Sequence, residues 1–330
     1  MRFTRLTLAL ETGALTLPET GSIVVYRPRS GDDLSCLPKD RLLIVQGFKP
    51  DHDHFAAQGY RVAVEGGGGH AAALVCLPRA KAEAHALLAI AAQSVLPGGP
   101  VIVDGQKTDG IDAIYKSLRA LGPVSEALSK AHGKIFTFPA AAQFDHWLPQ
   151  PQQIDGDFIT APGVFSADGP DAGSALLAQV LPTKLPSRVV DLGAGWGYLS
   201  RAILARDGVK ELHLVEAEAS ALDCARRNIT DPRAQFHWAD ATTWQVPHLA
   251  GAVVCNPPFH TGRDADPALG VAFLKAAARM LAPDGTLWMV ANRHLPYDLA
   301  LNALFHQVED LPGTSAFKLT RAAKPKRRQT

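Results

Sequence analysis

The chain contains 330 residues, 47% of which are apolar, and its formal net charge at pH 7 is +1. This length is comfortable for two domains with large cores, and the low charge argues against a strongly basic nucleic-acid coat, although not against a local basic patch. We expect no metal site, because no metal-ligand spacing is found among Cys36, Cys76, Cys224 and Cys255. Apolar runs stay well below the ~18 residues of a membrane span, so we expect a cytoplasmic protein with no membrane segment.

An early buried strand is predicted by the apolar run 41–45. It leads into residues 46–50, a turn with one glycine at the place where a ligand-binding glycine loop would stand. The later glycine run 66–69 is followed by no helical pattern, so we interpret it as a flexible loop. The first part of the chain therefore shows no predicted ligand cradle.

A strand, a helix and a second strand come next. The apolar run 72–76 predicts the first strand, residues 87–96 predict the helix, and residues 100–103 predict the second strand. Pro97, Gly98 and Gly99 end the helix. This order is typical of an α/β domain.

Residues 147–153 are rich in proline and glutamine and indicate a linker, so we predict one domain over 1–150 and another over 151–330. A segment at 158–166 and a helix at 173–180 precede the first strand of the second domain. The segment either folds over a ligand of that domain or only packs against its sheet.

A glycine-rich turn follows the apolar strand 189–192 and ends at Gly197, and residues 198–204 have helical spacing. Glycines permit positive φ and close approach of the backbone to a ligand, although G-x-G-x-G is weak evidence by itself and differs from the dinucleotide fingerprint G-x-G-x-x-G. The next strand, 213–216, ends in Glu216, where a parallel α/β fold places an acceptor for ribose hydroxyls. An ordinary solvated carboxylate fits the same pattern.

The most informative motif is Asn256-Pro257-Pro258-Phe259, directly after the apolar run 252–255. The two prolines stop the strand and stiffen the turn. The side-chain oxygen of Asn256 and a nearby backbone carbonyl can accept both N–H bonds of a planar amine, while an aromatic ring stacks on its plane. The alternative for these four residues alone is a proline turn with a buried Phe259.

Residues 251–290 repeat the strand, helix, Pro-Gly stop and strand of residues 72–103. The Val-Cys-x-Pro shared by both copies favours a duplication over a chance likeness of two α/β domains. Leu77 stands in the first copy where Asn256 stands in the second, so the amine acceptor is missing there. We therefore predict that the first domain is related in fold but binds no ligand.

The motifs together resemble the class I methyltransferases that use S-adenosylmethionine, and more narrowly the bacterial rRNA guanine-N2 methyltransferases of the small-subunit rRNA methyltransferase C group. The residues that carry the resemblance are 158–174, the loop 191–197, the motif 256–260 and the segment 290–297. The resemblance implies an α/β fold of two tandem class I methyltransferase (Rossmann-like) domains with mostly parallel sheets. The N-terminal domain is then degenerate and the C-terminal one catalytic.

The resemblance also implies a role for each candidate residue in binding the cofactor, S-adenosylmethionine. The glycines would lie against its methionine moiety, Asp191 would approach the ammonium, and Glu216 would bind the ribose. Asp240 would accept from the adenine amine, although a turn or helix-capping aspartate is a strong alternative. The full cofactor-binding set is Asp191, Gly193, Gly195, Gly197, Glu216, Asp240, Ala241 and Phe165, with Gly163 beside Phe165 as a cover.

The implied reaction methylates the exocyclic N2 amine of a guanine that is flipped out of its stack in rRNA, more specifically 16S rRNA. The implied catalytic residues are Asn256, Pro257 and Phe259: the first two hold the amine and the ring of Phe259 stacks on the base. Alignment is the main contribution, so no strong base is needed. The proton leaves to solvent or through His260, for which a turn histidine is an equal alternative.

The expected partner is ribosomal RNA or the small ribosomal subunit. Phosphate contacts are predicted for Arg263, Arg293 and a basic C-terminal run, although such tails are often only solvated. The run consists of Lys318, Arg321, Lys324, Lys326, Arg327 and Arg328.

Other functions remain open on the residues alone. One is a methyltransferase of another amine: guanine N2 in 23S rRNA, adenine N6 or a protein glutamine amide. Another is a non-enzymatic RNA-binding or assembly protein. An NAD-dependent oxidoreductase is disfavoured by the glycine spacing. The motifs name neither the modified nucleotide nor the oligomeric state, and do not separate naked RNA from an assembled particle.

Overall fold

The computed structural model describes residues 2–258, 260–261, 264–265 and 267–327. The chain divides into two compact units, Met1–Gln150 and Pro151–Thr330, each with its own sheet and core. Among the helices of the described residues, none combines the length and apolar character needed to cross a membrane.

The N-terminal unit is built on a mixed sheet with the strand order β3-β2-β1-β4-β5-β7-β6. Strands β1 to β5 pair in parallel, and β7 and β6 are antiparallel at one edge. The strands are β1 Ile23–Tyr26, β2 Leu42–Val45, β3 Arg61–Ala63, β4 Ala72–Cys76, β5 Pro100–Gln106, β6 Leu128–Lys130 and β7 Gly133–Pro139. The helices are α1 Arg2–Glu11, α2 Lys49–Ala57, α3 Lys81–Ser94 and α4 Ile111–Leu121, with 3₁₀ turns η1 Lys39–Arg41, η2 Lys107–Asp109 and η3 Ala142–Trp147.

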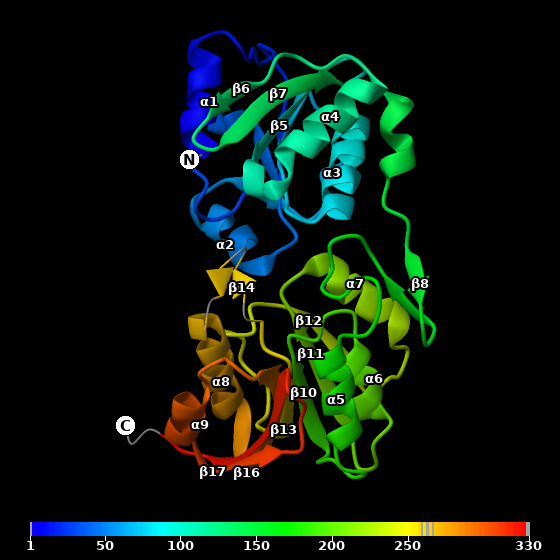
Figure 1. The fold of residues 1–330 in the computed structure, drawn as a ribbon, viewed down its shortest axis with the longest axis vertical. Coiled ribbons are helices and arrows are strands. Elements are labelled where there is room, and N and C mark those ends of the chain that lie inside the picture. The colour runs from blue at the N-terminus through cyan, green and yellow to red at the C-terminus, as the bar shows by residue number, and fades with distance from the viewer. Residues whose placement is uncertain (1, 259, 262–263, 266, 328–330) are drawn as a thin grey trace. The chain divides into compact units, whose positions relative to one another are not determined.

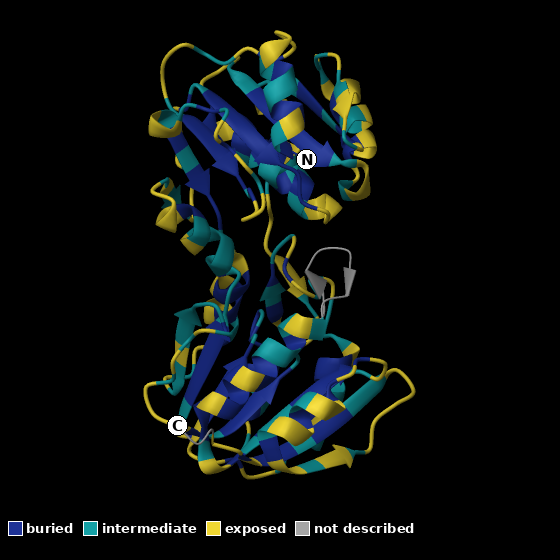
Figure 2. Ribbon diagram, turned by 90° about the vertical axis from the view of Figure 1, so that its left-hand side faces the viewer, coloured by how far each residue is buried: buried dark blue, intermediate teal, exposed yellow. Residues whose placement is uncertain are grey.

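The central strands of this unit are buried on both faces, as parallel strands are when helices cover the two sides of a sheet. Val24 and Tyr26 of β1 pack with side chains of α3 and α4, whereas Ile23 and Val25 pack with those of α1 and α2. Figure 1 shows α3 and α4 on one side of the sheet and α1 on the other. Figure 2 shows the buried strands and the exposed outer surfaces of the helices.

The C-terminal unit has a sheet with the order β12-β11-β10-β13-β16-β18-β17. Its strands are β10 Arg188–Leu192, β11 Glu211–Glu216, β12 Ala234–Trp238, β13 Ala250–Cys255, β16 Leu281–Asn292, β17 Phe305–Leu311 and β18 Phe317–Pro325. Two short hairpins lie outside the sheet: β8 Gln152–Ile154 with β9 Phe158–Thr160, and β14 His260–Thr261 with β15 Asp264–Ala265. The helices are α5 Ala172–Val180, α6 Tyr198–Leu204, α7 Ala219–Asn228, α8 Pro267–Met280 and α9 Asp298–Leu304. Figure 1 shows α5, α6 and α7 on one side of the strands and α8 and α9 on the other.

The two sheets have the same order, with parallel strands followed by an antiparallel pair at one edge. By position, β1 corresponds to β10, β2 to β11, β4 to β13 and β5 to β16. The predicted fold class, two tandem mostly parallel α/β domains, is confirmed.

The predicted position of the glycine-loop counterpart was wrong. The sequence interpretation placed it after the strand at 41–45, but that strand is β2, which corresponds to β11. The true counterpart follows β1, at Arg27. The strand Ile23–Tyr26 is as long as β2, but it was not recognised because Arg27-Pro28-Arg29 follows it instead of a glycine turn.

The predicted linker is partly regular structure, because Trp147 ends η3 and Gln152 begins β8. The helix predicted at 87–96 begins earlier, at Lys81. The glycine run at 66–69 leads into β4 without a helix after it, as expected.

Candidate functional site

A pocket lies at the carboxyl ends of β10 and β13, the edge at which open parallel sheets bind ligands. The predicted residues Phe165, Gly193, Gly195 and Asn256 contribute to its wall. The complete lining is Phe165, Ser166, Asp171, Ser174, Gly193, Ala194, Gly195, Trp196, Tyr198, Leu199 and Asn256. The topology therefore brings together motifs that lie far apart in the sequence.

The glycine loop has the backbone conformation that its composition predicts. Gly193, Gly195 and Gly197 have φ values of +81°, +55° and +94°, which L side chains rarely adopt. A Cβ built on Gly195 meets no atom of the described residues within 4 Å, whereas one on Gly197 comes within 3.2 Å of Ile229. Gly195 therefore leaves free space at the pocket, and Gly197 allows α6 to pack closely.

Asp191 lies in β10 and is fully buried. The hydroxyl of Ser200 donates to its Oδ2 at 2.6 Å, while its Oδ1 receives a hydrogen bond from no group in the described part of the chain. Burial raises the pKa of Asp191 to about 7, against the lowering effect of Ser200. A buried carboxylate oxygen without a donor suits a cationic ligand group, because such a group would stabilise the ionised form.

Glu216 ends β11 and organises the loop in front of it. Its Oε2 accepts from the backbone N–H of Gly195 and its Oε1 from that of Glu218, both at 2.8 Å. Burial raises the pKa of Glu216, and the two backbone N–H groups oppose this rise. The predicted contact with a ribose stays a prediction, but the bond to Gly195 was not foreseen.

Asp240 follows β12 and forms the turn that was considered as its alternative role. Its Oδ1 accepts from the backbone N–H of Thr242 at 2.8 Å and from the Thr242 hydroxyl at 2.7 Å. Ala241 is buried in the core on the α8 side of the sheet. Their roles in binding adenine stay predictions.

Asn256 directly follows β13, and its amide has a defined orientation. Its Nδ2 donates to Oδ2 of Asp171 at 3.0 Å and to Oγ of Ser174 at 2.9 Å. The NH₂ group is thus engaged on one side, which leaves Oδ1 as the acceptor for a ligand. Pro257 is buried after it. The predicted roles of Phe259, Arg263 and the His260 side chain fall outside the described residues.

A network that the sequence interpretation missed holds the segment before the sheet against the glycine loop. Asn228, the last residue of α7, donates from Nδ2 to the carbonyls of Ile159 at 2.9 Å and Trp196 at 2.8 Å. Its Oδ1 accepts from the N–H of Ile159 at 2.7 Å. The indole of Trp196 in turn donates to the carbonyl of Phe165 at 2.9 Å, and the Phe165 side chain is 61% exposed beside the pocket.

Most cations predicted to contact phosphate have protein partners. Lys318 forms ion pairs with Asp298 and with Asp310, the latter at 3.1 Å, and Arg321 lies 3.5 Å from Glu309. The other partners are backbone carbonyls: Lys326 donates to Asn302, Arg327 to Leu281, and Arg293 to Thr314 and Phe317. These contacts give the cations structural roles at the surface, and phosphate binding by them stays a prediction.

The corresponding edge of the N-terminal unit has different side chains at the same places. Arg27 has a φ of +57° and donates its N–H to the carbonyl of Val45 at 2.9 Å, as Gly193 does to that of Val215. Gln46 accepts from the N–H of Phe48 at 2.9 Å, the bond that Glu216 makes with Glu218. The strand registers place Cys76, and not Leu77, at the position of Asn256, so the predicted alignment was wrong by one residue. The reason is that Tyr26 pairs with Val75 in β4 as Leu192 pairs with Cys255 in β13.

Charged side chains are buried at this N-terminal edge. Arg5 of α1 pairs with Asp104 near the end of β5, and both side chains are fully buried. Arg2 lies 3.2 Å from the same Asp104 oxygen and 3.0 Å from Asp32, in the turn after β1. These ion pairs therefore lie at the same edge of the sheet as the pocket of the C-terminal unit.

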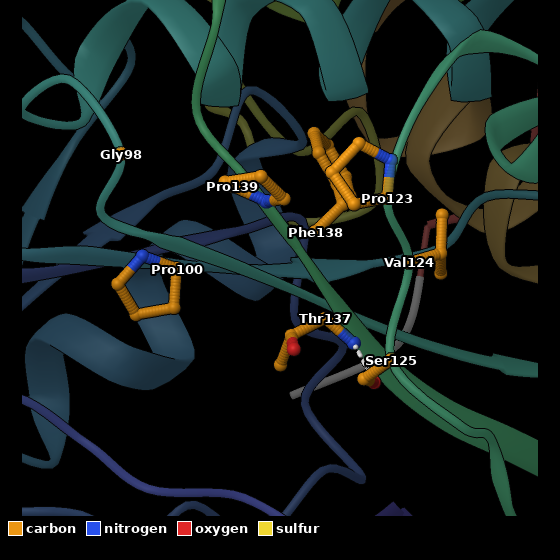
Figure 3. A pocket seen from close by; sticks show the side chains of 8 residues that line it. All are labelled: Gly98, Pro100, Pro123, Val124, Ser125, Thr137, Phe138 and Pro139. Carbon is orange, nitrogen blue, oxygen red and sulfur yellow. Dashed lines mark hydrogen bonds between the residues drawn. The ribbon is translucent and has the colours of Figure 1, made fainter.

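Another pocket in the N-terminal unit lies away from this edge (Figure 3). Its wall includes Pro100, where β5 begins, and Pro139, where the antiparallel β7 ends, so it lies at the amino ends of the parallel strands. The dashed line in Figure 3 is the bond from the Thr137 N–H to the Ser125 hydroxyl, 2.9 Å. This pocket lies at the edge of the sheet opposite the carboxyl ends of the parallel strands. It is therefore not equivalent to the pocket of the C-terminal unit.

Comparison with known proteins is consistent with this geometry. Residues 155–321 match the family described as "Methyltransferase small domain". The chain is 31% identical over 267 residues to the ribosomal RNA small subunit methyltransferase C of Alteromonas mediterranea, covering 77% of this chain and 73% of that protein. It is 30% identical over 259 residues to the protein of the same name from Aeromonas hydrophila, covering 75% of each.

Among solved structures, the fold is similar to that of the T. thermophilus 16S rRNA N2 G1207 methyltransferase in complex with AdoMet and guanosine. The TM-score is 0.79 at 23% identity, and the similarity covers 98% of this chain and 91% of that one. The likeness therefore extends over both units.

Proposed function

The chain belongs to the family of ribosomal RNA small subunit methyltransferase C, and on this premise we propose that it transfers a methyl group from S-adenosylmethionine to the exocyclic N2 amine of a guanine in 16S rRNA. The C-terminal unit is the catalytic domain, and the N-terminal unit is a degenerate copy without a cofactor site. The observation that carries the proposal is the Asn256 amide, whose NH₂ group is held by Asp171 and Ser174 at the wall of a pocket beside a glycine loop. Its oxygen is then left to accept from a ligand.

Residues that line the pocket, such as Gly195 and Phe165, and the nearby Asp191 and Glu216, which lie outside its lining, fit the cofactor. The Oδ1 atom of Asp191, without a donor among the described residues, suits the ammonium of the methionine moiety. The free space in front of Gly195 allows the cofactor to approach the backbone. Glu216 remains able to accept from ribose hydroxyls, because each carboxylate oxygen has a second lone pair. Phe165 would cover the bound cofactor from the exposed side.

When bound, S-adenosylmethionine supplies a methyl group on a positively charged sulfur. The lone pair of the guanine N2 nitrogen forms the new N–C bond, the S–C bond breaks and its electrons stay on sulfur, and one N–H proton leaves to solvent. Asn256 Oδ1 and the Pro257 carbonyl accept the two N–H bonds of the amine and thereby aim its lone pair at the methyl carbon. Alignment of this kind contributes up to ~7–11 kcal/mol in well-oriented reactions.

The target guanine must leave its stack to enter such a pocket, because its amine is otherwise paired or shielded. The relative of solved structure acts on G1207 of 16S rRNA, so the equivalent guanine is the first position to examine. We propose that the reaction takes place in the cytoplasm, on 16S rRNA or on the small subunit that contains it.

The test is methyl transfer to small subunits and to naked 16S rRNA from a strain that lacks the gene, with N2-methylguanosine measured by mass spectrometry. We expect the wild-type protein to form this nucleoside and Asn256→Ala to reduce the rate about a hundredfold or more, because alignment is lost. The matched control is Asn302→Ala on the surface of α9, which should leave the rate unchanged. If a labelled methyl group from S-adenosylmethionine were released by protease and not by nuclease, that result would contradict RNA as the substrate.

A further inference from the structure

A single carboxylate oxygen joins the helix that precedes the sheet to the amine-binding motif. Asp171 is the N-cap of α5: its Oδ2 accepts from the backbone N–H of Ser174 at 2.8 Å. The same Oδ2 accepts from Nδ2 of Asn256 at 3.0 Å, across 85 residues of sequence. Ser174 Oγ accepts a second bond from this Nδ2 at 2.9 Å.

The two ends of an asparagine amide have nearly the same shape but opposite polarity, since one accepts and the other donates hydrogen bonds. With the oxygen toward the pocket, Asn256 can accept from an amine. With the amide reversed, its NH₂ would face the N–H bonds of the guanine amine, and two donors would oppose each other. The rotamer of Asn256 therefore decides whether the pocket binds an amine at all.

Asp171 distinguishes the two orientations because an ionised carboxylate only accepts hydrogen bonds. Reversal of the amide would place Asn256 Oδ1 against Asp171 Oδ2, with two acceptors at hydrogen-bond distance and no proton between them. Ser174 cannot discriminate in this way, because a hydroxyl donates or accepts equally well. The orientation of the Asn256 amide is therefore selected by Asp171 and not by Ser174.

We propose that Asp171 is a positioning residue that fixes the Asn256 amide with its oxygen toward the substrate and so makes the site specific for an amine. This proposal rests on the proposed function, since it presumes that Asn256 binds the guanine N2 group. It gives the segment before the sheet a role in the reaction in addition to any contact with the cofactor.

The decisive variant is Asp171→Asn, which keeps the size of the side chain and an oxygen that can cap α5. Its amide can donate as well as accept, so it no longer excludes the reversed Asn256. We expect kcat at saturating 16S rRNA to fall about tenfold or more, while the Kd for S-adenosylhomocysteine stays within about twofold. The matched control is Ser174→Ala, which removes the neutral partner and should lower kcat less than about threefold.

A second readout needs no methyl transfer. Guanosine carries the N2 amine and inosine lacks it, so the ratio of their Kd values in the presence of S-adenosylhomocysteine reports on the acceptor at the pocket. The wild-type protein should prefer guanosine, and Asp171→Asn should reduce the preference about tenfold, because the reversed amide opposes the amine but not the C–H of inosine. A merely structural role for Asp171 would weaken the binding of both nucleosides together.

The outcomes separate the two proposals. A wild-type protein that methylates rRNA and an Asp171→Asn variant with unchanged kcat and unchanged nucleoside preference would overturn the positioning role alone. A loss of S-adenosylhomocysteine affinity in proportion to kcat would overturn it as well, since that result indicates a distorted fold. A wild-type protein that transfers no methyl group to rRNA would overturn the proposed function, and this inference with it.

Discussion

The two units share one sheet order but differ at the carboxyl edge of the sheet. In the C-terminal unit this edge holds a pocket, a glycine loop and the buried Asp191. In the N-terminal unit the same edge is filled by Arg5 and Asp104, which are fully buried and paired with each other. Both units therefore keep the apolar strands on which the fold depends, while the polar positions at this edge differ between them. On our proposal, these positions decide which unit binds a ligand.

At corresponding positions of the two units the backbone conformation is alike, but the side chains differ in chemistry. The backbone of the turn after the central strand is alike, with Arg27 in a left-handed conformation where Gly193 stands. An amide at Gln46 replaces the carboxylate of Glu216 while the same type of local bond is kept. The N-terminal unit thus retains the hydrogen bonds that shape its loops and lacks the carboxylate that we propose contacts the cofactor in the C-terminal unit.

The largest expected effect is in the N-terminal unit. Asp104→Ala should leave the buried charge of Arg5 without its partner and lower the free energy of unfolding by about 3–5 kcal/mol. Denaturant unfolding followed by a probe in that unit measures this loss. The affinity for S-adenosylhomocysteine in the folded protein should stay unchanged, and a large fall in that affinity would show that the N-terminal edge does contribute to the cofactor site.

The next effect concerns the bonds that hold the glycine loop in the C-terminal unit. Asn228→Asp removes two donors and places a carboxylate against the carbonyls of Ile159 and Trp196. We expect the Kd for S-adenosylhomocysteine to rise about tenfold or more. The control is Asn302→Asp, also near the end of a helix, and calorimetry should show wild-type binding for it. Equal binding by both variants would mean that the loop keeps its shape without Asn228.

The affinity of the C-terminal unit for S-adenosylhomocysteine should depend on pH through Asp191. Burial raises the pKa of Asp191 to about 7, above its value in the unfolded chain, so its contribution to stability is present below about pH 4 and is lost as the pH rises through 7. A bound ammonium favours the carboxylate, so the affinity for S-adenosylhomocysteine should rise about tenfold between pH 6 and pH 7.5. Calorimetry in two buffers should detect a proton released on binding at pH 6. Asp191→Asn should bind more weakly and without this slope, and a slope that persists in the variant would assign it to another group.

The smallest effect is expected from making the N-terminal turn more like the C-terminal one. In Arg27→Gly the relief of the positive φ and the loss of the contacts of Arg27 with Glu83 and Gln46 have opposite signs. The net change in unfolding free energy should stay within about 1 kcal/mol. The variant should gain no second site for S-adenosylhomocysteine, because the buried ion pairs remain. A second binding site in calorimetry would mean that the arginine in place of glycine is what prevents the N-terminal unit from binding S-adenosylhomocysteine.

The sequence alone was sufficient where a feature is local. The repeated strand, helix, Pro-Gly stop and strand follow from apolar periodicity, and the glycine loop and Asn256 follow from short motifs at strand ends. A D-x-x-S pattern before α5 could have identified the N-cap Asp171, since Asp is a preferred residue there.

The contacts that join distant segments could not be found in this way. Asn228 bonds to Ile159 across 69 residues and Asn256 bonds to Asp171 across 85 residues, and no periodic pattern encodes such pairs. The charged closure of the N-terminal edge was missed for the same reason, because Arg5 and Asp104 lie 99 residues apart. The β1 strand was missed although it is as long as the predicted β2, because no glycine turn follows it.

The most direct test of the contrast between the units is the stoichiometry of S-adenosylhomocysteine binding to the full chain, measured by isothermal titration calorimetry. One molecule should bind per chain, with an affinity that Asp191→Asn reduces and Asp104→Ala leaves intact. Two molecules per chain, or one that is lost in Asp104→Ala and kept in Asp191→Asn, would contradict the assignment of the cofactor pocket to the C-terminal unit.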